Sequence, residues 1–254
     1  MRDYPYDHIL FHPGQYCRTC QWLKPARSKH CSICRACIAR FDHHCVWINN
    51  CVTKDNLRWF LALLCSLVLV LVYGTYLAWL LLRPQLQAIN KAHTAQGLLT
   101  RLSIVLARNR SAGSVGLLAL LSCPLASGLL CYHIYLIWAG TTTNETQKWS
   151  DLQLDMAAGV VWKGRRSAAY TSDGTSTDSS QHVTQHEPST SWPVSSNQIV
   201  VRTVDGRAPV FNSRQNGQKT TFDWNRCWTL SEVENLYDLG FVDNVRDALN
   251  LAVS

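Results

Sequence analysis

Residues 17–51 read CRTCQWLKPARSKHCSICRACIARFDHHCVWINNC and contain seven cysteines and three histidines. A structural zinc site takes four protein ligands, usually thiolates and imidazoles, and a Cys-x2-Cys pair supplies two of them from one tight turn. The stretch holds two such pairs, Cys17/Cys20 and Cys31/Cys34. Two closed zinc sites would use eight of the ten candidate ligands. The remaining two are then available as a nucleophile and its base.

Each Cys-x2-Cys pair needs two further ligands. Neighbouring residues such as His30 and Cys31 point in different directions, so they more easily serve different metals. Cys37 then completes one site and Cys51 the other. Zinc is predicted to be structural here, because the segment has few aliphatic core residues and is expected to unfold without the metal. The competing interpretation is that the cysteines are free thiols packed as small apolar residues.

The run Asp42-His43-His44-Cys45, within this cysteine spacing and followed by Asn56 and Phe60, resembles the cysteine-rich domain of the DHHC protein S-acyltransferases. The spacing matches over residues 17–60 without insertion or deletion. The resemblance implies two interleaved structural zinc ions. It assigns the ligands of one ion to Cys17, Cys20, His30 and Cys37, and those of the other to Cys31, Cys34, His44 and Cys51.

His43 and Cys45 remain, with Asp42 beside them. Only a thiolate attacks, and a thiol with a pKa near 8.5 is mostly protonated at neutral pH, so an adjacent imidazole that takes the proton activates it. A carboxylate next to that imidazole fixes its tautomer and stabilises the imidazolium. Together with the resemblance, this predicts that Cys45 is the nucleophile, His43 the base and Asp42 the orienting group. The alternative is a third metal site, or a zinc-binding fold without catalysis.

The family transfers palmitoyl groups to proteins by a ping-pong scheme. By resemblance, Cys45 attacks the thioester of palmitoyl-CoA, and a cysteine thiol of a membrane-associated protein then takes the acyl chain from Cys45. The segments Pro5-Tyr6-Asp7, Phe11-His12-Pro13-Gly14 and 24–29 resemble fungal members that acylate SNAREs at the endoplasmic reticulum. The implied partners are acyl-CoA, the membrane and proteins with juxtamembrane cysteines, SNAREs among the candidates. The implied location is the endoplasmic reticulum membrane, with the Golgi membrane as the alternative.

Two uncharged segments predict transmembrane helices. Residues 61–82 carry no charge, and a helix of this length crosses a hydrocarbon core of about 30 Å. Arg83-Pro84 is expected to end it, because proline cannot continue a helix. Residues 112–140 are also uncharged, and Pro124 predicts a kink there. The predicted fold class is an α-helical membrane protein with two transmembrane helices, a small zinc-stabilised cysteine-rich domain and a partly disordered cytosolic tail.

The predicted layout is a cysteine-rich domain (1–56), a transmembrane helix (57–82), a lumenal loop (83–111), a transmembrane helix (112–140), a juxtamembrane segment (141–162), a disordered linker (163–221) and a C-terminal helical element (222–254). The lumenal segment is predicted to be an ordinary loop with a helical turn or two, with an interfacial amphipathic helix as the alternative. The linker is rich in Ser, Thr, Gln and Asn, so it cannot bury enough apolar surface to order itself. Ser231 is the expected N-cap of the C-terminal helix, and Gly240 its break.

The charge distribution favours a membrane surface over nucleic acid. Residues 57–140 carry six basic residues and no acidic one, in a chain with a net charge of +7. The chain shows no Lys/Arg stripe with interleaved aromatic residues, so no nucleic-acid partner is predicted. Two spans place the cysteine-rich domain and the tail on one side. Closely spaced thiols need a reducing compartment, which assigns both to the cytosol.

Two further segments resemble family motifs. Thr142, Thr143 and Glu145 form a Thr-Thr-x-Glu motif directly after the second span, which the resemblance places near the active site. Residues 237–244 resemble a C-terminal element in which an aromatic residue, here Tyr237, and an asparagine, here Asn244, support the fold. Ordinary helix packing and capping would explain the same two residues.

Family members have four transmembrane helices, and the cysteine-rich domain lies between the second and third. The two segments here correspond to the third and fourth, so the first two are expected to be missing from this sequence. A truncated chain, a partner that supplies the helices and an inactive form are the three interpretations. The competing functions are an S-acyltransferase that uses Cys45, a non-catalytic zinc-binding membrane adaptor, and a zinc-finger module that binds protein or nucleic acid. The apolar spans argue against the last.

Overall fold

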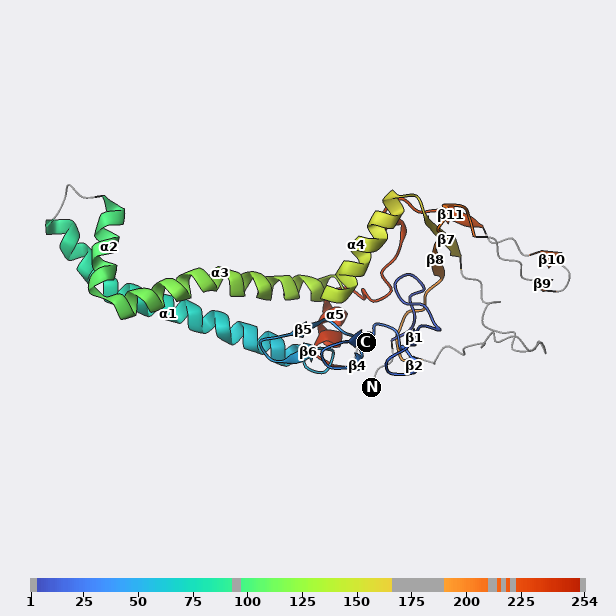
Figure 1. Cartoon of the computed structure of the whole chain (residues 1–254), viewed down its shortest axis with the longest axis horizontal. Coiled ribbons are helices and arrows are strands. Elements are labelled where there is room, and N and C mark those ends of the chain that lie inside the picture. The colour runs from blue at the N-terminus through green and yellow to red at the C-terminus, as the bar shows by residue number, and fades with distance from the viewer. Residues whose placement is uncertain are drawn as a thin grey trace. The chain divides into compact units, whose positions relative to one another are not determined.

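The computed structural model describes residues 4–92, 97–165, 190–209, 214–215, 218–219 and 223–251. They form two compact units, most of whose elements are labelled in Figure 1. One unit consists of residues 57–135. The other joins the residues up to Asn56 to those from Leu136 onward.

The first unit is helical and contains α1 (Leu57–Ala92), α2 (Leu98–Arg108) and most of α3 (Arg110–Trp138). At 1.5 Å per residue, α1 is about 54 Å long and α3 about 44 Å, so each exceeds a hydrocarbon core of about 30 Å. Residues Leu57–Ile89 and Arg110–Trp138 are long and apolar enough to cross a membrane. Leucine and valine side chains along both helices are exposed, as expected for helices solvated by lipid. The prediction of two apolar spanning helices is confirmed.

Small residues bring α1 and α3 into close contact. A Cβ atom added to Gly116 on α3 would lie 2.4 Å from the Cβ of Ala78 on α1. One turn further along α3, the Cβ of Ala119 lies 3.7 Å from where a Cβ added to Gly74 of α1 would be. Small residues in such a seam let helix backbones approach closely enough for dispersion contacts to hold them together in lipid.

Helix α1 continues through Pro84 to Ala92, so the prediction that it ends at Arg83-Pro84 is wrong. A proline removes one backbone donor, but residues 85–88 (Gln-Leu-Gln-Ala) are all good helix formers that can continue the helix. The prediction of an ordinary loop before α3 is also wrong, because α2 occupies eleven of those residues. Gln85 and Asn109 exchange two amide hydrogen bonds of 2.6 and 3.1 Å, which tie α1 to the α2–α3 corner.

The second unit begins with three short antiparallel hairpins. They are β1 (Tyr16–Cys17) with β2 (Trp22–Leu23), β3 (Lys29–Cys31) with β4 (Ala36–Ile38), and β5 (His43–Cys45) with β6 (Asn50–Val52). Around the last two hairpins the buried apolar cluster contains only Cys31, Phe41 and Cys51, with Cys34 and Ile38 against it. Such a cluster is too small to fix three hairpins by apolar burial alone.

The rest of this unit packs around a larger core. It contains α4 (Thr143–Ala157), an antiparallel sheet in the order β11 (Trp224–Arg226), β7 (Val161–Arg165), β8 (Gln198–Arg202), a small hairpin of β9 (Arg214–Gln215) and β10 (Gln218–Lys219), a 3₁₀ helix (Leu230–Glu232) and α5 (Phe241–Ala248). Its buried residues come from the N-terminal segment, α4, the sheet and the tail; they include Phe11, Leu152, Met156, Val161, Val200, Leu236 and Tyr237. The described N-terminal segment and the tail up to Tyr237 therefore share one core.

Two predictions for the tail are wrong. Residues 190–209, assigned to a disordered linker, are ordered: β8 pairs with β7, and Val200 and Trp192 are buried in the core. The polar composition of the linker concealed the short run Ile199-Val200-Val201. For the other linker residues, chiefly 166–189, the prediction of disorder lies outside the described residues. In the C-terminal element, Thr229 rather than Ser231 has the capping position, and α5 starts only after Gly240.

The α1–α3 contact makes a prediction about Gly116. Gly116→Leu should destabilise the helical unit by about 1–3 kcal/mol, because the new side chain meets Ala78 at less than contact distance. The thermal midpoint in detergent, followed by fluorescence-detected size exclusion, measures this. Gly128→Leu on the same helix is the control, since a Cβ at Gly128 has no atom within 4 Å. Equal midpoints for the two variants would contradict the assignment of this seam.

Candidate active site and metal centres

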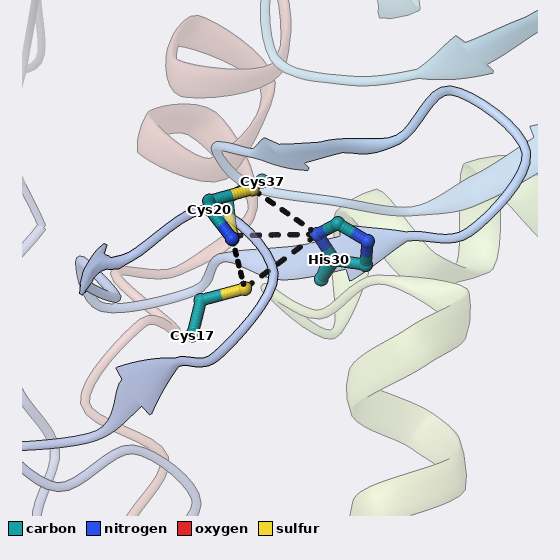
Figure 2. A group of neighbouring side chains, drawn as sticks. All are labelled: Cys17, Cys20, His30 and Cys37. Atoms are coloured by element: carbon teal, nitrogen blue, oxygen red, sulfur yellow. Dashed lines mark hydrogen bonds between the residues drawn. The ribbon is translucent and has the colours of Figure 1, made fainter.

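Four side chains of the first two hairpins converge in the first candidate metal centre (Figure 2). Cys17 and Cys20 come from the β1–β2 hairpin, whereas His30 and Cys37 face each other as a cross-strand pair of β3 and β4. The distances from the Nδ1 atom of His30 to the three sulfur atoms are 3.6 Å (Cys17), 3.3 Å (Cys20) and 3.9 Å (Cys37).

The second group is built in the same way, one hairpin further along. Cys31 and Cys34 belong to the β3–β4 hairpin, and His44 and Cys51 are a cross-strand pair of β5 and β6. The distances from His44 Nδ1 to the sulfur atoms are 3.6 Å (Cys31), 3.4 Å (Cys34) and 3.6 Å (Cys51). The sulfur atoms of Cys34 and Cys51 are 3.5 Å apart.

These separations fit a tetrahedral zinc ion in each group. With Zn–S bonds of about 2.3 Å and Zn–N bonds of about 2.0 Å, a tetrahedron separates sulfur from nitrogen by about 3.5 Å and two sulfurs by about 3.8 Å. In both Cys-x2-Cys turns the backbone N–H of the second cysteine points at the sulfur of the first, at 3.4 Å. Three thiols and one imidazole make a closed ligand set, which is typical of a structural rather than a catalytic zinc.

The three hairpins repeat with a period of fourteen residues, a regularity that the sequence-based reasoning missed. The equivalent positions are Cys17/Cys31/Cys45, Cys20/Cys34/Ile48, His30/His44 and Cys37/Cys51. Each metal group thus combines the Cys-x2-Cys turn of one hairpin with the histidine and cysteine of the next. This one-repeat offset is the structural reason why the two groups interleave.

The repeat also explains why Cys45 stands apart. It ends β5 as Cys17 ends β1 and Cys31 ends β3, but Ile48 replaces the second cysteine of its turn. The chain then enters α1 at Leu57, and no fourth hairpin follows to supply a histidine and a cysteine. Cys45 is a buried free thiol outside both four-residue groups.

The alternation of strand β5 separates His44, a member of the second group, from His43 and Cys45. Successive side chains in a strand point to opposite faces, so His43 and Cys45 share one face and His44 lies on the other. His43 Nδ1 is 3.0 Å from Asp42 Oδ2. With Nδ1–H donating to that carboxylate, the other ring nitrogen is left to accept a proton from a thiol.

The surroundings of His43 favour its protonated form. The hydrogen bond to Asp42 raises the pKa of His43, burial opposes this, and the charge of Asp42 and the contact with the Cys45 side chain raise it further. A raised pKa makes His43 a stronger base for the thiol proton. The arrangement can therefore hold a thiolate–imidazolium pair, the reactive form of a cysteine nucleophile.

The start of α4 holds Asp42 in place. Thr143 donates its backbone N–H to Asp42 Oδ1, and Thr142 donates its hydroxyl to the carbonyl of Phe41 at 3.2 Å. Thr142 is also the N-cap of α4, in a capping box with Glu145. The Thr-Thr-x-Glu motif thus lies against the Asp42 segment. A helix N-terminus next to a carboxylate favours its ionised form.

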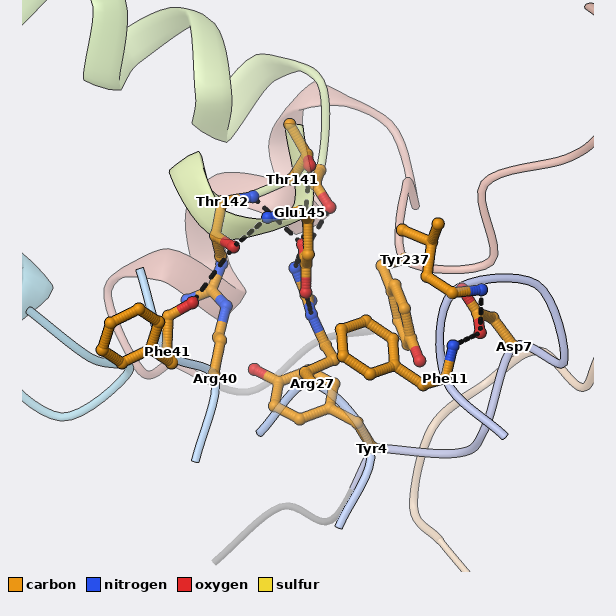
Figure 3. Close-up of polar contacts among 12 residues, drawn as sticks. Tyr4, Asp7, Phe11, Arg27, Arg40, Phe41, Thr141, Thr142, Glu145 and Tyr237 are labelled. Atoms are coloured by element: carbon orange, nitrogen blue, oxygen red, sulfur yellow. Dashed lines mark hydrogen bonds and ion pairs between the residues drawn. The ribbon is translucent and has the colours of Figure 1, made fainter. Parts of the chain in front are cut away.

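Glu145 is itself fixed by a buried ion pair with Arg27 (Figure 3). Both nitrogen–oxygen distances of the bidentate contact are 2.7 Å, and each side chain is almost fully buried. The guanidinium stacks on the rings of Tyr237 (4.3 Å) and Tyr4 (4.8 Å) and donates to the carbonyl of Gly140 at 3.3 Å. Burial lowers the pKa of Arg27, but the charge and the hydrogen bonds of Glu145 outweigh it and raise that pKa, so the guanidinium keeps its proton.

Gly140 is required where α3 turns toward α4. Its φ is +60°, and a Cβ there would lie 2.6 Å from the Cα of Asp238. Because Gly140 has no side chain, the C-terminal segment can pass directly over this turn. The carbonyl of Gly140 accepts the hydrogen bond from Arg27.

The two predicted C-terminal residues have separate contacts. Tyr237 is buried, stacks on Arg27 and donates its hydroxyl to the carbonyl of Pro5 at 2.9 Å. Asn244 donates to the last carbonyl of α3, that of Trp138, at 3.1 Å, and accepts the N–H of Leu239 at 3.0 Å. They support the fold and do not lie among the reactive side chains.

The sequence did not predict a role for three buried charged residues near the site, which are Arg27, Arg40 and Asp247. Arg27 was named only as part of the segment 24–29. Nothing in their local sequence distinguishes them from the solvated charges that surround them. Their partners lie far along the chain, for example 118 residues away for Arg27 and Glu145.

Comparison with known proteins agrees with this geometry. The profile of the family described as "DHHC palmitoyltransferase" matches residues 10–150. The chain belongs to the DHHC palmitoyltransferase family. It is 44% identical to the Neurospora crassa palmitoyltransferase SWF1 over 97% of this chain and 59% of that protein. For the Aspergillus fumigatus palmitoyltransferase swf1, the identity is 41% over the whole chain and 70% of that protein.

More distant members share a smaller region. The Saccharomyces cerevisiae palmitoyltransferase SWF1 is 34% identical over 63% of this chain and 42% of that protein. The sequence is thus a DHHC membrane protein of the fungal SWF1 type, with two candidate spans and cysteine/histidine groups compatible with zinc. It covers only part of the length of these relatives, 59% for the Neurospora protein.

The metal groups predict the zinc content of this DHHC chain. The purified chain should hold about two zinc ions, and Cys20→Ser should lower the content to about one, because a three-ligand remnant binds structural zinc poorly. Inductively coupled plasma mass spectrometry measures the ratio. Cys65→Ser, on an exposed thiol of α1, should leave it unchanged. A Cys20→Ser chain with undiminished zinc would contradict the first group.

The Asp42–His43 contact predicts how Cys45 reacts. Asp42→Asn should lower the pKa of His43, since its largest raising interaction is lost, and so weaken the base that takes the proton of the Cys45 thiol. We expect alkylation of Cys45 by iodoacetamide at pH 7 to slow about tenfold. Peptide mapping by mass spectrometry follows this, with the Cys65 peptide of the same sample as internal control. An unchanged rate at Cys45 would mean that Asp42 does not act through His43.

Proposed function

We propose that this chain is a protein S-palmitoyltransferase that moves a fatty acyl group from palmitoyl-CoA to cysteine thiols of membrane-associated proteins through an acyl-Cys45 intermediate. The observation that carries the proposal is the free thiol of Cys45 on the same strand face as His43, whose Nδ1 lies 3.0 Å from Asp42. The relatives named palmitoyltransferase support the same reaction class.

The reaction uses only side chains of β5 and the residue before it. His43 takes the proton of the Cys45 thiol while Asp42 stabilises the imidazolium. The sulfur attacks the thioester carbonyl of palmitoyl-CoA, the carbonyl carbon–sulfur bond to CoA breaks, and the departing CoA thiolate receives the proton from His43. A substrate cysteine then attacks the acyl-Cys45 carbonyl in the reverse sense, with His43 as base and then acid. One thioester is broken and one formed at each step, so the acyl-CoA supply sets the direction.

The zinc ions take no part in these steps. Cys17, Cys20, His30 and Cys37 would hold one ion and Cys31, Cys34, His44 and Cys51 the other, and the metals would fix the three hairpins that carry Cys45. His44 connects the two functions, because it is a ligand on one face of β5 while its neighbours on the other face are reactive.

The place of the site in the chain suits membrane substrates. Strand β5 ends at Cys45 and α1 begins at Leu57, so the nucleophile can lie only a short chain segment from the lipid. Palmitoyl-CoA and juxtamembrane cysteines of single-span proteins, SNAREs among them, are the substrates that this placement favours. We assign the cysteine-rich domain and the tail to the cytosol, where thiols remain reduced, and the chain to the endoplasmic reticulum membrane.

Acylation of the chain itself tests the proposal. Purified protein in lipid nanodiscs, incubated with an alkyne analogue of palmitoyl-CoA, should acquire one label that hydroxylamine removes, as expected for a thioester. Cys45→Ser should abolish the label and keep the full zinc content, since Cys45 lies outside both metal groups. In-gel fluorescence after click coupling measures it.

Cys131→Ser is the matched control, because it removes an exposed thiol of α3 and should retain the label. Loss of zinc in Cys45→Ser would make Cys45 a metal ligand instead of a nucleophile. A folded, zinc-loaded parent chain that acquires no label would contradict acyl transfer and leave a zinc-binding membrane adaptor as the function.

A further inference from the structure

The three residues that lead into β5 are each held by a distant part of the chain. Asp42 accepts the N–H of Thr143, and Phe41 accepts the hydroxyl of Thr142. The residue before them, Arg40, forms an ion pair with Asp247 of α5 at 3.3 Å. The approach to the reactive strand is therefore fixed by α4 at two positions and by the C-terminal helix at the third.

The Arg40–Asp247 contact is buried on both sides. The side chains of Arg40 and Asp247 are 5% and 4% exposed. Tyr4 donates its hydroxyl to both carboxylate oxygens of Asp247, at 2.9 and 3.0 Å. Two other nitrogens of Arg40, Nε and Nη1, are buried without a hydrogen-bond partner among the described residues. The carboxylate of Asp247 is thus the anion that the structure sets against this guanidinium.

Tyr4 remains a hydrogen-bond donor to the Asp247 carboxylate at physiological pH. Burial raises the pKa of Tyr4 to about 12, against the opposing effect of Arg40 and Arg27, so the phenol keeps its proton. Its ring also lies 5.0 Å from the ammonium group of Lys54 and 4.8 Å from the Arg27 guanidinium. The phenol therefore contacts both the Arg27–Glu145 pair and the Arg40–Asp247 pair.

Helix α5 is fastened at a second point on the same face. Asn244 lies one turn before Asp247, and its side chain donates to the carbonyl of Trp138 at the end of α3. The N-cap of α5, Gly240, has a φ of +86°, which sets the angle at which the helix leaves the preceding segment. With both contacts made, α5 cannot slide or rotate without breaking one of them.

We propose that Arg40 and Asp247 are positioning residues for acyl transfer, through which the C-terminal helix α5 holds the Asp42–His43 pair in its reactive geometry. The inference rests on the proposed function. Arg40 is two residues before Asp42, so a shift of its backbone moves the carboxylate that faces His43 Nδ1 at 3.0 Å. A displacement of about 1 Å in such a constellation can cost about 100-fold in rate.

The energetics favour a geometric role for this pair. A buried ion pair adds little net stability over a well-packed apolar pair, because desolvation offsets the attraction between the charges. What it supplies is a fixed distance and direction. Tyr4 donates a hydrogen bond to the Asp247 carboxylate and Arg40 forms an ion pair with it, so two contacts fix the position of Asp247.

Single-turnover acylation separates a positioning role from a merely structural one. The nanodisc-embedded chain is mixed with a range of palmitoyl-CoA concentrations, and the rate and amplitude of Cys45 labelling are measured. Asp247→Asn should lower the limiting rate about 10- to 100-fold, with the half-saturating concentration, the amplitude and the zinc content unchanged. Asp243→Asn is the matched control: it makes the same change on the same helix, in a partly exposed pair with Arg246.

A second variant covers a failure of Asp247→Asn to fold. Arg40→Met combined with Asp247→Leu removes both charges, which buried pairs commonly tolerate. It should fold and hold zinc but keep the low limiting rate. A parental rate in this double variant would overturn the proposal. So would an Asp247→Asn chain whose amplitude falls while the rate of the remaining active fraction is unchanged, because that is loss of fold alone.

Alkylation of Cys45 distinguishes this inference from the proposed function. If the parent chain acquires no acyl label, the proposed function fails, and the iodoacetamide rate of Cys45 then decides the positioning role. Slower alkylation in Asp247→Asn than in Asp243→Asn would support it, and equal rates would overturn it.

Discussion

The convergence of two groups of three cysteines and one histidine is the constraint on which the rest of the candidate site depends. The hairpins of residues 15–56 bury too little apolar surface to define their relative positions, and their cysteines and histidines are the groups that converge. Because each four-residue group spans two consecutive hairpins, two zinc ions would suffice to order three hairpins. The third hairpin supplies only the second half of a group, His44 and Cys51, and its first cysteine, Cys45, lies outside both groups.

Two buried ion pairs outside these cysteine/histidine groups also hold the segment that carries Cys45. Arg27 and Glu145 connect the first half of the cysteine-rich domain to the start of α4, and Arg40 and Asp247 connect its last part to α5. Both pairs are buried, where the loss of one partner leaves an uncompensated charge. Such contacts permit little variation in distance. They suit a site in which a carboxylate, an imidazole and a thiol must stay in register.

The relation between the two ends of the chain follows from the same contacts. Tyr4 lies 243 residues from its acceptor Asp247, and Tyr237 lies 232 residues from the carbonyl of Pro5. The N-terminal segment, the cysteine-rich domain and the tail thus close into one unit, while residues 57–135 form a separate helical one. A DHHC chain of the SWF1 type therefore uses its tail as part of the domain that carries the candidate nucleophile.

The sequence by itself determined the features that depend on local spacing. Cys-x2-Cys turns, the two apolar helices and the run Asp42-His43-His44-Cys45 are readable because ligand spacing, helix length and strand alternation act over a few residues. Only the tertiary structure decided the continuation of α1 past Pro84, the ordered strand around Val200 and the buried pairs of Arg27 and Arg40. The strand and the two buried pairs each depend on a partner remote in the sequence, whereas the continuation of α1 depends on the residues that follow Pro84. A proline is tolerated if its neighbours continue the helix, a short apolar run becomes a strand if a second strand accepts it, and a charge is buried only where an opposite charge meets it.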